Sequence, residues 1–283
     1  LELLETQVVA LMNTGTTRMI AQLLDAIDQA DADDDVRAVI FTGRGKAFCA
    51  GADLSSGGKT FDYAAGESTV AAPGEAEASA KKDRIYRDGA GLITLRLFAF
   101  NKPVIAAING AAVGMGATMT LPCDIRIAAE SARFGFVFAK RGIVPEGAST
   151  WFLPRLVGVS QAAEWLYSGR VFNAPEALAG GLVKAIVPND ALIAEATTLA
   201  REFAESAPIS VALTRQMLWR GMVADHPMYA HRVDSRAVQY TGAMPDAKER
   251  VTSFLEKRPA EFTGSVSDGL PDVFPDWDEP PFS

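Results

Sequence analysis

Hydrophobic positions in the first half of the chain alternate between helical spacing and short continuous apolar runs. Helical spacing predicts helices over Thr17–Ala30, Ile85–Phe98 and Ala117–Leu121. Continuous apolar runs predict three buried strands, at Val36–Thr42, Pro103–Ile108 and Asp124–Ala129. Short buried strands that alternate with helices are typical of parallel sheets covered on both faces. The pattern therefore predicts an α/β fold.

The second half of the chain has a different pattern. From Ala191 onward the apolar spacing is helical almost throughout, and the chain closes with an acidic tail rich in Pro and aromatic residues. We expect a core at residues 1–190, a helical C-terminal region with the tail at 191–283, and a tail that lies on a protein surface. The Gly-, Ala- and Ser-rich segment Ser55–Lys82 is only weakly periodic, which predicts a long loop.

Composition excludes several classes of function. A net charge of −8 argues against a nucleic-acid partner, which would require a basic face. No apolar run has the roughly 18 residues needed to span a membrane, so we expect no membrane insertion. Two cysteines are too few for a disulfide framework and suit the reducing cytoplasm, where we expect the protein to act.

Glu146 is the only acidic residue between Phe134 and Val157, a stretch rich in Phe and Trp. Apolar surroundings disfavour the charged carboxylate, so the pKa of Glu146 should rise toward the range that suits proton transfer at neutral pH. A second interpretation stays open. Because Glu146 follows Pro145, it could lie in the first turn of a helix and complement the helix dipole.

Two glycine- and alanine-rich segments each follow a predicted strand: Ala47–Leu54 and Asn109–Thr118. Small residues let a ligand approach the main chain closely, and a helix that begins near Met115 would present unpaired amides. Two such amides that converge on one oxygen form an oxyanion hole, although tight turns alone also explain the glycines. Dinucleotide binding is disfavoured because Met119 replaces the third glycine of its motif.

Taken together, these segments resemble the crotonase family of enoyl-CoA hydratases and isomerases. The stretches that carry the resemblance are VRAVIFTGRGKAFCAGADL, KPVIAAINGAAVGMGATMTLPCDIRIAAESARFGF, GLVKAIVP and VTSFLEKRPAEF. The resemblance implies a ClpP/crotonase-like fold of repeated ββα units with a helical C-terminal trimerisation region. It also implies an acyl-CoA thioester substrate, a homotrimer or a hexamer formed by two trimers, and no metal or redox cofactor, coenzyme A being part of the substrate.

The resemblance assigns roles to individual positions. The oxyanion-hole amides fall on Ala52 and Met115, which would hold the thioester oxygen as it gains enolate charge. Residues 50–54 would lie along coenzyme A, and the loop Ser55–Lys82 near the acyl end. The substrate-binding positions implied in this way are Ala50, Gly51, Asp53, Leu54, Gly114, Gly116, Thr118 and Phe138.

The acidic residues favour one reaction over another. Hydratases of the family carry two glutamates, and Thr118 and Phe138 occupy those places here. Glu146 instead stands where the family's 3-enoyl-CoA to 2-enoyl-CoA isomerases place their catalytic acid, in a P-E-G-x-S motif. We therefore expect an isomerase with one carboxyl. The alternatives are a hydratase that uses Glu146 with a water molecule, and a non-catalytic acyl-CoA-binding scaffold.

Overall fold

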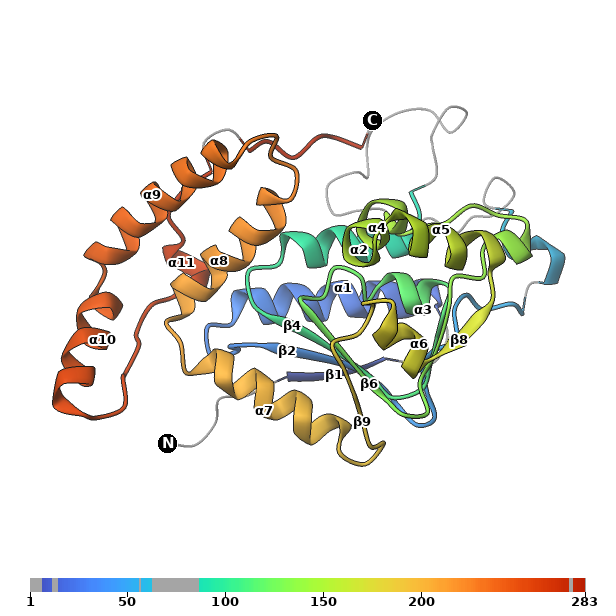
Figure 1. Cartoon of the computed structure of the whole chain (residues 1–283), viewed down its shortest axis with the longest axis horizontal. Helices are drawn as coiled ribbons and strands as arrows, with labels where there is room; N and C mark the ends of the chain where they lie inside the picture. The colour runs from blue at the N-terminus through green and yellow to red at the C-terminus, as the bar shows by residue number, and fades with distance from the viewer. Residues whose placement is uncertain (1–6, 12–14, 56, 63–86, 275–276, 283) are drawn as a thin grey trace.

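The computed structural model describes residues 7–11, 15–55, 57–62, 87–274 and 277–282. Most of the predicted loop Ser55–Lys82 therefore lies outside the described residues, apart from a short 3₁₀ turn, η1 (Gly57–Lys59). Strands gather in the middle of the molecule, helices cover them on two sides, and a helical cluster extends away at one end (Figure 1).

A five-stranded parallel sheet forms the centre of the fold, in the order β1-β2-β4-β6-β9. Its strands are β1 (Gln7–Leu11), β2 (Val39–Gly43), β4 (Val104–Ile108), β6 (Ile125–Ala129) and β9 (Ala185–Val187). All five residues of β4 are fully buried, which explains the uninterrupted apolar run in its sequence. Three of these strands were predicted, with β2 beginning three residues later because Val36 belongs to a turn closed on Asp33.

A second, smaller sheet has the order β3-β5-β7-β8, and only β8 runs antiparallel to its neighbour. Its strands have three residues each: β3 (Ala47–Cys49), β5 (Ala111–Val113), β7 (Arg133–Gly135) and β8 (Val171–Asn173). Long strands β2, β4 and β6 are each followed by a short strand of this sheet and then by helical structure. The implied ββα repeat is therefore confirmed.

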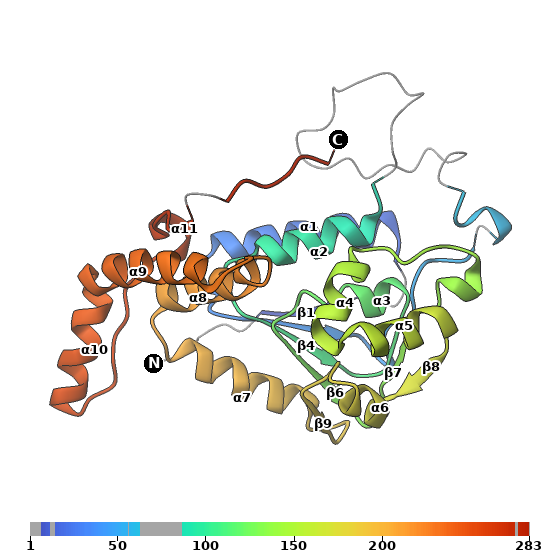
Figure 2. The same cartoon turned by 45° about the horizontal axis from the view of Figure 1, so that its top comes forward.

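Helices occupy both faces of the large sheet (Figure 2). Their bounds are α1 (Thr17–Ala32), α2 (Gly89–Ala99), α3 (Met115–Thr118), α4 (Ser149–Val157), α5 (Val159–Ser168), α6 (Ala174–Ala179), α7 (Leu192–Ala204), α8 (Pro208–Gly221), α9 (Pro227–Ala243), α10 (Pro245–Glu256) and α11 (Val266–Gly269), with a 3₁₀ turn η2 (Ala139–Arg141). Helices α1 and α2 share the main core with one face of the sheet, whereas α7 packs through Leu192, Ala196 and Ala200 on the other. The division expected at residue 190 thus precedes a helix that still covers the core.

Two predicted helices have shifted ends. Asp88 precedes α2 as its N-cap residue and accepts a hydrogen bond from the Gly91 amide, so α2 begins at Gly89 and not at residue 85. Helix α3 begins at Met115, the start that the oxyanion-hole interpretation requires and two residues before the one that periodicity indicated, and turns follow it. Both changes leave a candidate site residue, Asp88 or Met115, at the start of a helix.

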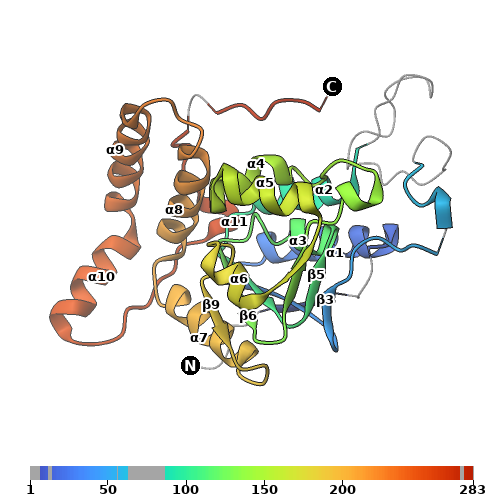
Figure 3. The ribbon, with the colours of Figure 1, turned by 45° about the vertical axis from the view of Figure 1, so that its right-hand side comes forward.

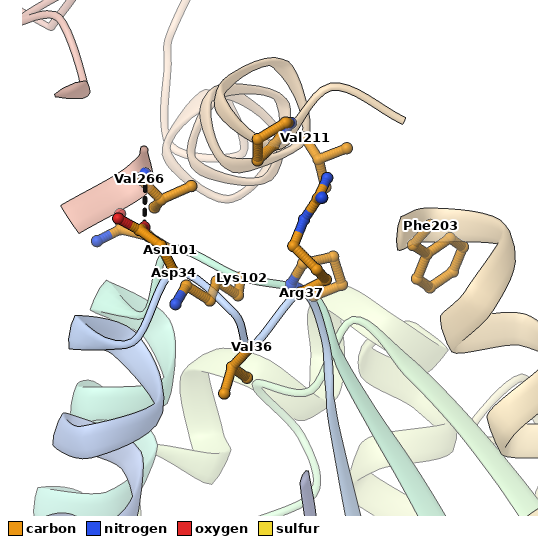
Figure 4. A pocket seen from close by; sticks show the side chains of 10 residues that line it. Asp34, Val36, Arg37, Asn101, Lys102, Phe203, Val211 and Val266 are labelled. Carbon is orange, nitrogen blue, oxygen red and sulfur yellow. Dashed lines mark hydrogen bonds between the residues drawn. The ribbon is translucent and has the colours of Figure 1, made fainter. Parts of the chain in front are cut away.

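Helices α8, α9 and α10 form the cluster that extends from the core (Figure 3). Beyond it, α11 is tied to the core through Asp34, whose carboxylate accepts a hydrogen bond from Val266 N at 2.8 Å (Figure 4). The same carboxylate accepts a second one from Ser267 N at 3.0 Å. The tail then packs on its own chain, with the Arg220 guanidinium 4.4 Å from the Phe274 ring centre. No helix in the described ranges has the length and apolarity to cross a bilayer.

Candidate active site

The two glycine-rich segments meet beside the small sheet. Parallel pairing of β3 with β5 places their carboxyl ends together, and a side chain added at Gly114 would lie 3.9 Å from the Cα of Gly51. Within the described part of the chain, the amides of Ala52 and Met115 donate to no protein acceptor. Met115 is the first residue of α3, where an amide has no partner inside the helix. Two available donors therefore stand on adjacent segments.

Close backbone packing sets the spacing of these donors. A Cβ at Gly116 would lie 2.0 Å from the carbonyl oxygen of Cys49, so only glycine lets α3 approach the end of β3 this closely. The Met115 side chain is buried and packs over Gly15, whose amide donates to the carbonyl of Gly51 at 2.8 Å. Met115 can thus serve through its amide while its side chain packs against neighbouring backbone.

Glu146 lies in a sharp turn just before α4. The helix begins at Ser149, so the interpretation of Glu146 as a first-turn residue is wrong. Gly147 and Ala148 both have positive φ angles, +64° and +50°, and the Ser149 hydroxyl donates to the Glu146 carbonyl at 2.6 Å. A left-handed alanine costs about 1–2 kcal/mol, so the surrounding contacts must impose this conformation.

The carboxyl group of Glu146 has an unusual acidity. Burial, together with the negative charge of Asp88, raises the pKa of Glu146 from 4.5 to about 7. Burial also raises the pKa of the Cys49 thiol, and the charge of Glu146 adds to that rise. Cys49 ends β3, so Glu146 lies within electrostatic range of the segment that carries Ala52. The rise in pKa expected from the sequence is confirmed.

Asp88 is the residue of this region that sequence reasoning missed. Its Oδ1 accepts hydrogen bonds from the Gly91 amide at 2.6 Å and from the Gly147 amide at 3.0 Å. One carboxylate oxygen thus joins the start of α2 to the residue after Glu146. The available signal was an Asp directly before a helix, which is typical of an N-cap, but nothing local indicated its second partner.

Thr118 and Phe138 are both buried, with side chains 0% and 3% exposed. The Thr118 hydroxyl donates to the Met115 carbonyl at 3.2 Å, and a Cβ at Gly147 would lie 3.2 Å from that hydroxyl oxygen. Thr118 therefore borders the turn that carries Glu146. Phe138 lies in the main hydrophobic core at the start of η2. Neither side chain can take the proton-transfer role of a carboxylate.

The remaining candidate positions surround the two amide segments. Gly51, Gly114 and Gly116 are buried, whereas Ala50, Asp53 and Leu54 are exposed. The exposed residues follow β3 and are accessible to a ligand that approaches Ala52 from solvent. No group of three or more metal-ligating side chains occurs among the described residues. The site as described offers two amide donors and one carboxyl group of near-neutral pKa.

Comparison with known proteins identifies the family. The family model described as enoyl-CoA hydratase/isomerase matches residues 9–265. The chain belongs to the enoyl-CoA hydratase/isomerase family. Among relatives of the family, Enoyl-CoA hydratase ACTT3 of Alternaria alternata is 37% identical over 260 residues, which cover 90% of this chain and 80% of the relative.

Other members of the family carry different names. A 1,2-epoxyphenylacetyl-CoA isomerase of Escherichia coli is 33% identical over 89% of this chain and 91% of its own length. A probable enoyl-CoA hydratase/isomerase from Mycobacterium abscessus, of known structure, superposes with a TM-score of 0.78 at 31% identity, covering 91% of this chain and 95% of that one. The crotonase-like fold is thereby confirmed, and the family name covers both hydratases and isomerases.

Proposed function

We propose that this enzyme moves the double bond of an unsaturated acyl-CoA from C3 to C2, with Glu146 as the only proton carrier. The observation that carries the proposal is one carboxyl group with a pKa of about 7, within electrostatic range of Cys49 at the end of β3, together with two amides that find no acceptor among the described residues. A group whose pKa matches the surrounding pH can both accept and return a proton efficiently. A shift of a double bond requires these two proton transfers and no other ionisable group.

The proposed steps need only residues of the chain. Glu146 removes a proton from C2, and the electron pair of that C–H bond forms a dienolate whose oxygen accepts hydrogen bonds from the amides of Ala52 and Met115. The same carboxyl then returns the proton to C4, which leaves the double bond between C2 and C3. Each amide donor of this kind lowers the activation free energy by roughly 3–4 kcal/mol. Atoms balance without water, metal or redox cofactor.

The alternative reaction, hydration, is favoured by the names of several relatives, including ACTT3. Water addition needs one group to activate water and a proton for the α-carbon, and the residues at the usual hydratase positions are Thr118 and Phe138. Both are buried, and Phe138 is apolar. Hydration would therefore require Glu146 to act on water by itself. We place this reaction second.

The test compares two reactions in Glu146→Gln, with Glu130→Gln as a control at an exposed glutamate. Glutamine keeps the shape and removes the ionisable group, so we expect isomerisation of 3-hexenoyl-CoA to fall by a factor of about 10³, within the range for general acid–base groups. The rise in 2-enoyl thioester absorbance measures it, and loss of that absorbance from crotonyl-CoA measures hydration. Full activity in Glu146→Gln would refute the proposal, and dominant hydration by the unmodified enzyme would favour the alternative. Binding of acyl-CoA without either reaction would indicate a scaffold.

We also propose that the cluster α8–α10 assembles the protein into trimers, or into hexamers of two trimers. Large apolar side chains on these helices are 62–73% exposed: Leu218, Val238, Val251, Phe254 and Leu255. Exposed apolar side chains gathered on one part of a protein are typical of an interface. Light scattering on the purified protein, with Phe254→Glu as the disrupting variant, tests this assembly, and a monomer at all concentrations would contradict it.

A further inference from the structure

Asp88 contacts the turn that carries Glu146 from a distant part of the chain. All the elements from α2 to η2 separate the two residues in the chain, yet Asp88 Oδ1 lies 3.0 Å from the Gly147 amide nitrogen. The same oxygen lies 2.6 Å from the amide nitrogen of Gly91. A carboxylate that accepts two backbone amides is held firmly, because charge-assisted hydrogen bonds are about twice as strong as neutral ones.

We propose that Asp88 positions Glu146, by tying the amide of Gly147 to the first turn of α2. This inference rests on the proposed function of Glu146 as the proton carrier. Gly147 and Ala148 are both in the left-handed region, a conformation that persists only when several contacts impose it. The hydrogen bond to Asp88 is such a contact, and the packing of Gly147 against Ala90 and Thr118 is another.

The charge of Asp88 has a second effect on Glu146. Burial is the larger cause of the raised pKa of Glu146, and the negative charge of Asp88 adds to it. Among the described residues, the other titratable group coupled to Glu146 is the Cys49 thiol on β3. Helix α3 and the first turn of α4 carry no charged side chain. Arg87, next to Asp88, extends its guanidinium over the ring of Phe282.

Two substitutions separate the geometry from the charge. Asp88→Asn keeps an oxygen that can accept from both amides and can still cap α2, but it removes the negative charge. Asp88→Ser keeps a capping hydroxyl for α2, but its shorter side chain leaves the Gly147 amide without its acceptor. Asp190→Asn removes a charge from an exposed position between β9 and α7 and serves as the control.

For Asp88→Asn we expect the pH midpoint of kcat/KM for 3-hexenoyl-CoA to move to lower pH by roughly one unit, with a plateau about threefold lower because the base is weaker. For Asp88→Ser we expect kcat to fall ten- to a hundredfold at an unchanged KM, since misplacing the base affects the chemical step. A purely structural residue would lower stability in both variants and leave the pH midpoint unmoved.

A titration without substrate separates this inference from the proposed function. In protein labelled with ¹³C at the glutamate carboxyl carbons, the Glu146 resonance is assigned by its absence in Glu146→Gln. Its midpoint should fall in Asp88→Asn and stay unchanged in Asp190→Asn. Full kcat in Asp88→Ser would overturn the positioning role of Asp88, and an unchanged midpoint in Asp88→Asn would overturn its electrostatic effect on Glu146. Failure of the enzyme to isomerise 3-enoyl-CoA would overturn the proposed function alone.

Discussion

Replacing Glu146 with glutamine should stabilise the protein at alkaline pH while it lowers the proposed isomerisation by a factor of about 10³. The reason is the raised pKa of Glu146, about 7 in the folded protein against 4.5 in the unfolded chain. Because the folded protein binds this proton more tightly, the unmodified carboxyl contributes its full share of stability below pH 4.5. That share is lost as the pH rises to about 7, where Glu146 ionises in the folded state as well.

The magnitude follows from the size of the pKa difference. One pKa unit corresponds to about 1.4 kcal/mol, so the ionised carboxylate lowers the free energy of unfolding by roughly 3 kcal/mol at pH 8. Glutamine has no charge to desolvate and avoids this cost. For a domain of this size, roughly 2 °C of Tm accompanies each kcal/mol, so Glu146→Gln should melt about 6 °C higher at pH 8.

Thermal unfolding of Glu146→Gln and of the unmodified protein at pH 5 and pH 8 tests this reasoning, with Glu130→Gln as the exposed control. We expect the difference in Tm between the first two proteins to be about 6 °C at pH 8 and only about 1–2 °C at pH 5, where most of the cost is still absent. If Glu146→Gln and the unmodified protein had the same Tm at pH 8 as well as at pH 5, the claim that burial and Asp88 disfavour the ionised carboxylate would be refuted. A difference that is the same at both pH values would point to packing of the amide and not to charge.

Three further substitutions test other parts of the structure. Gly116→Val places a side chain against the Cys49 carbonyl, so kcat/KM should fall at least a hundredfold because the Met115 amide moves, as initial rates would show. Arg215→Met leaves Asp124 without its buried partner and should lower the free energy of unfolding in urea by about 3–5 kcal/mol. Asp34→Ala should lower the free energy of unfolding in urea by about 1 kcal/mol at pH 7. Burial opposes ionisation of Asp34, but hydrogen bonds outweigh it and lower the pKa of Asp34 to about 2. The stabilisation by Asp34 should therefore fade as the pH falls from 3.8 toward 2.

The large sheet could be predicted because its strands are buried on both faces. Residues 104–108 present apolar side chains to two layers of helices, so their apolar run is continuous and predicts a buried strand. The short strands of the second sheet have three residues each, too few for a periodic signal. Two aromatic residues near Glu146 in sequence stack on rings of other elements. Phe134 stacks on Phe172 with ring centres 5.8 Å apart, and Phe136 on Trp165 with ring centres 6.4 Å apart.

The candidate site could be read from the sequence only where its parts follow one another in the chain. The two amide segments each follow a strand, and parallel pairing of β3 with β5 brings them together as expected. Asp88 could not be found in this way, since its contact with Gly147 joins residues far apart in sequence and no periodic pattern records such a contact. The left-handed Ala148 was equally hidden, because alanine favours ordinary helical conformations.

Two costly features meet in the turn at Glu146. A desolvated carboxylate costs roughly 3 kcal/mol at alkaline pH, and the left-handed Ala148 adds about 1–2 kcal/mol. Asp88 contributes to both, because its hydrogen bond to Gly147 holds the turn and its charge opposes ionisation of Glu146. A residue needed only to hold the turn could be a neutral Asn. An Asn would remove the repulsion between Asp88 and the ionised Glu146, and with it part of the cost in folding free energy. Under the proposed mechanism the negative charge has a use, since it raises the pKa of Glu146 further and makes the carboxylate a stronger base toward a C–H proton.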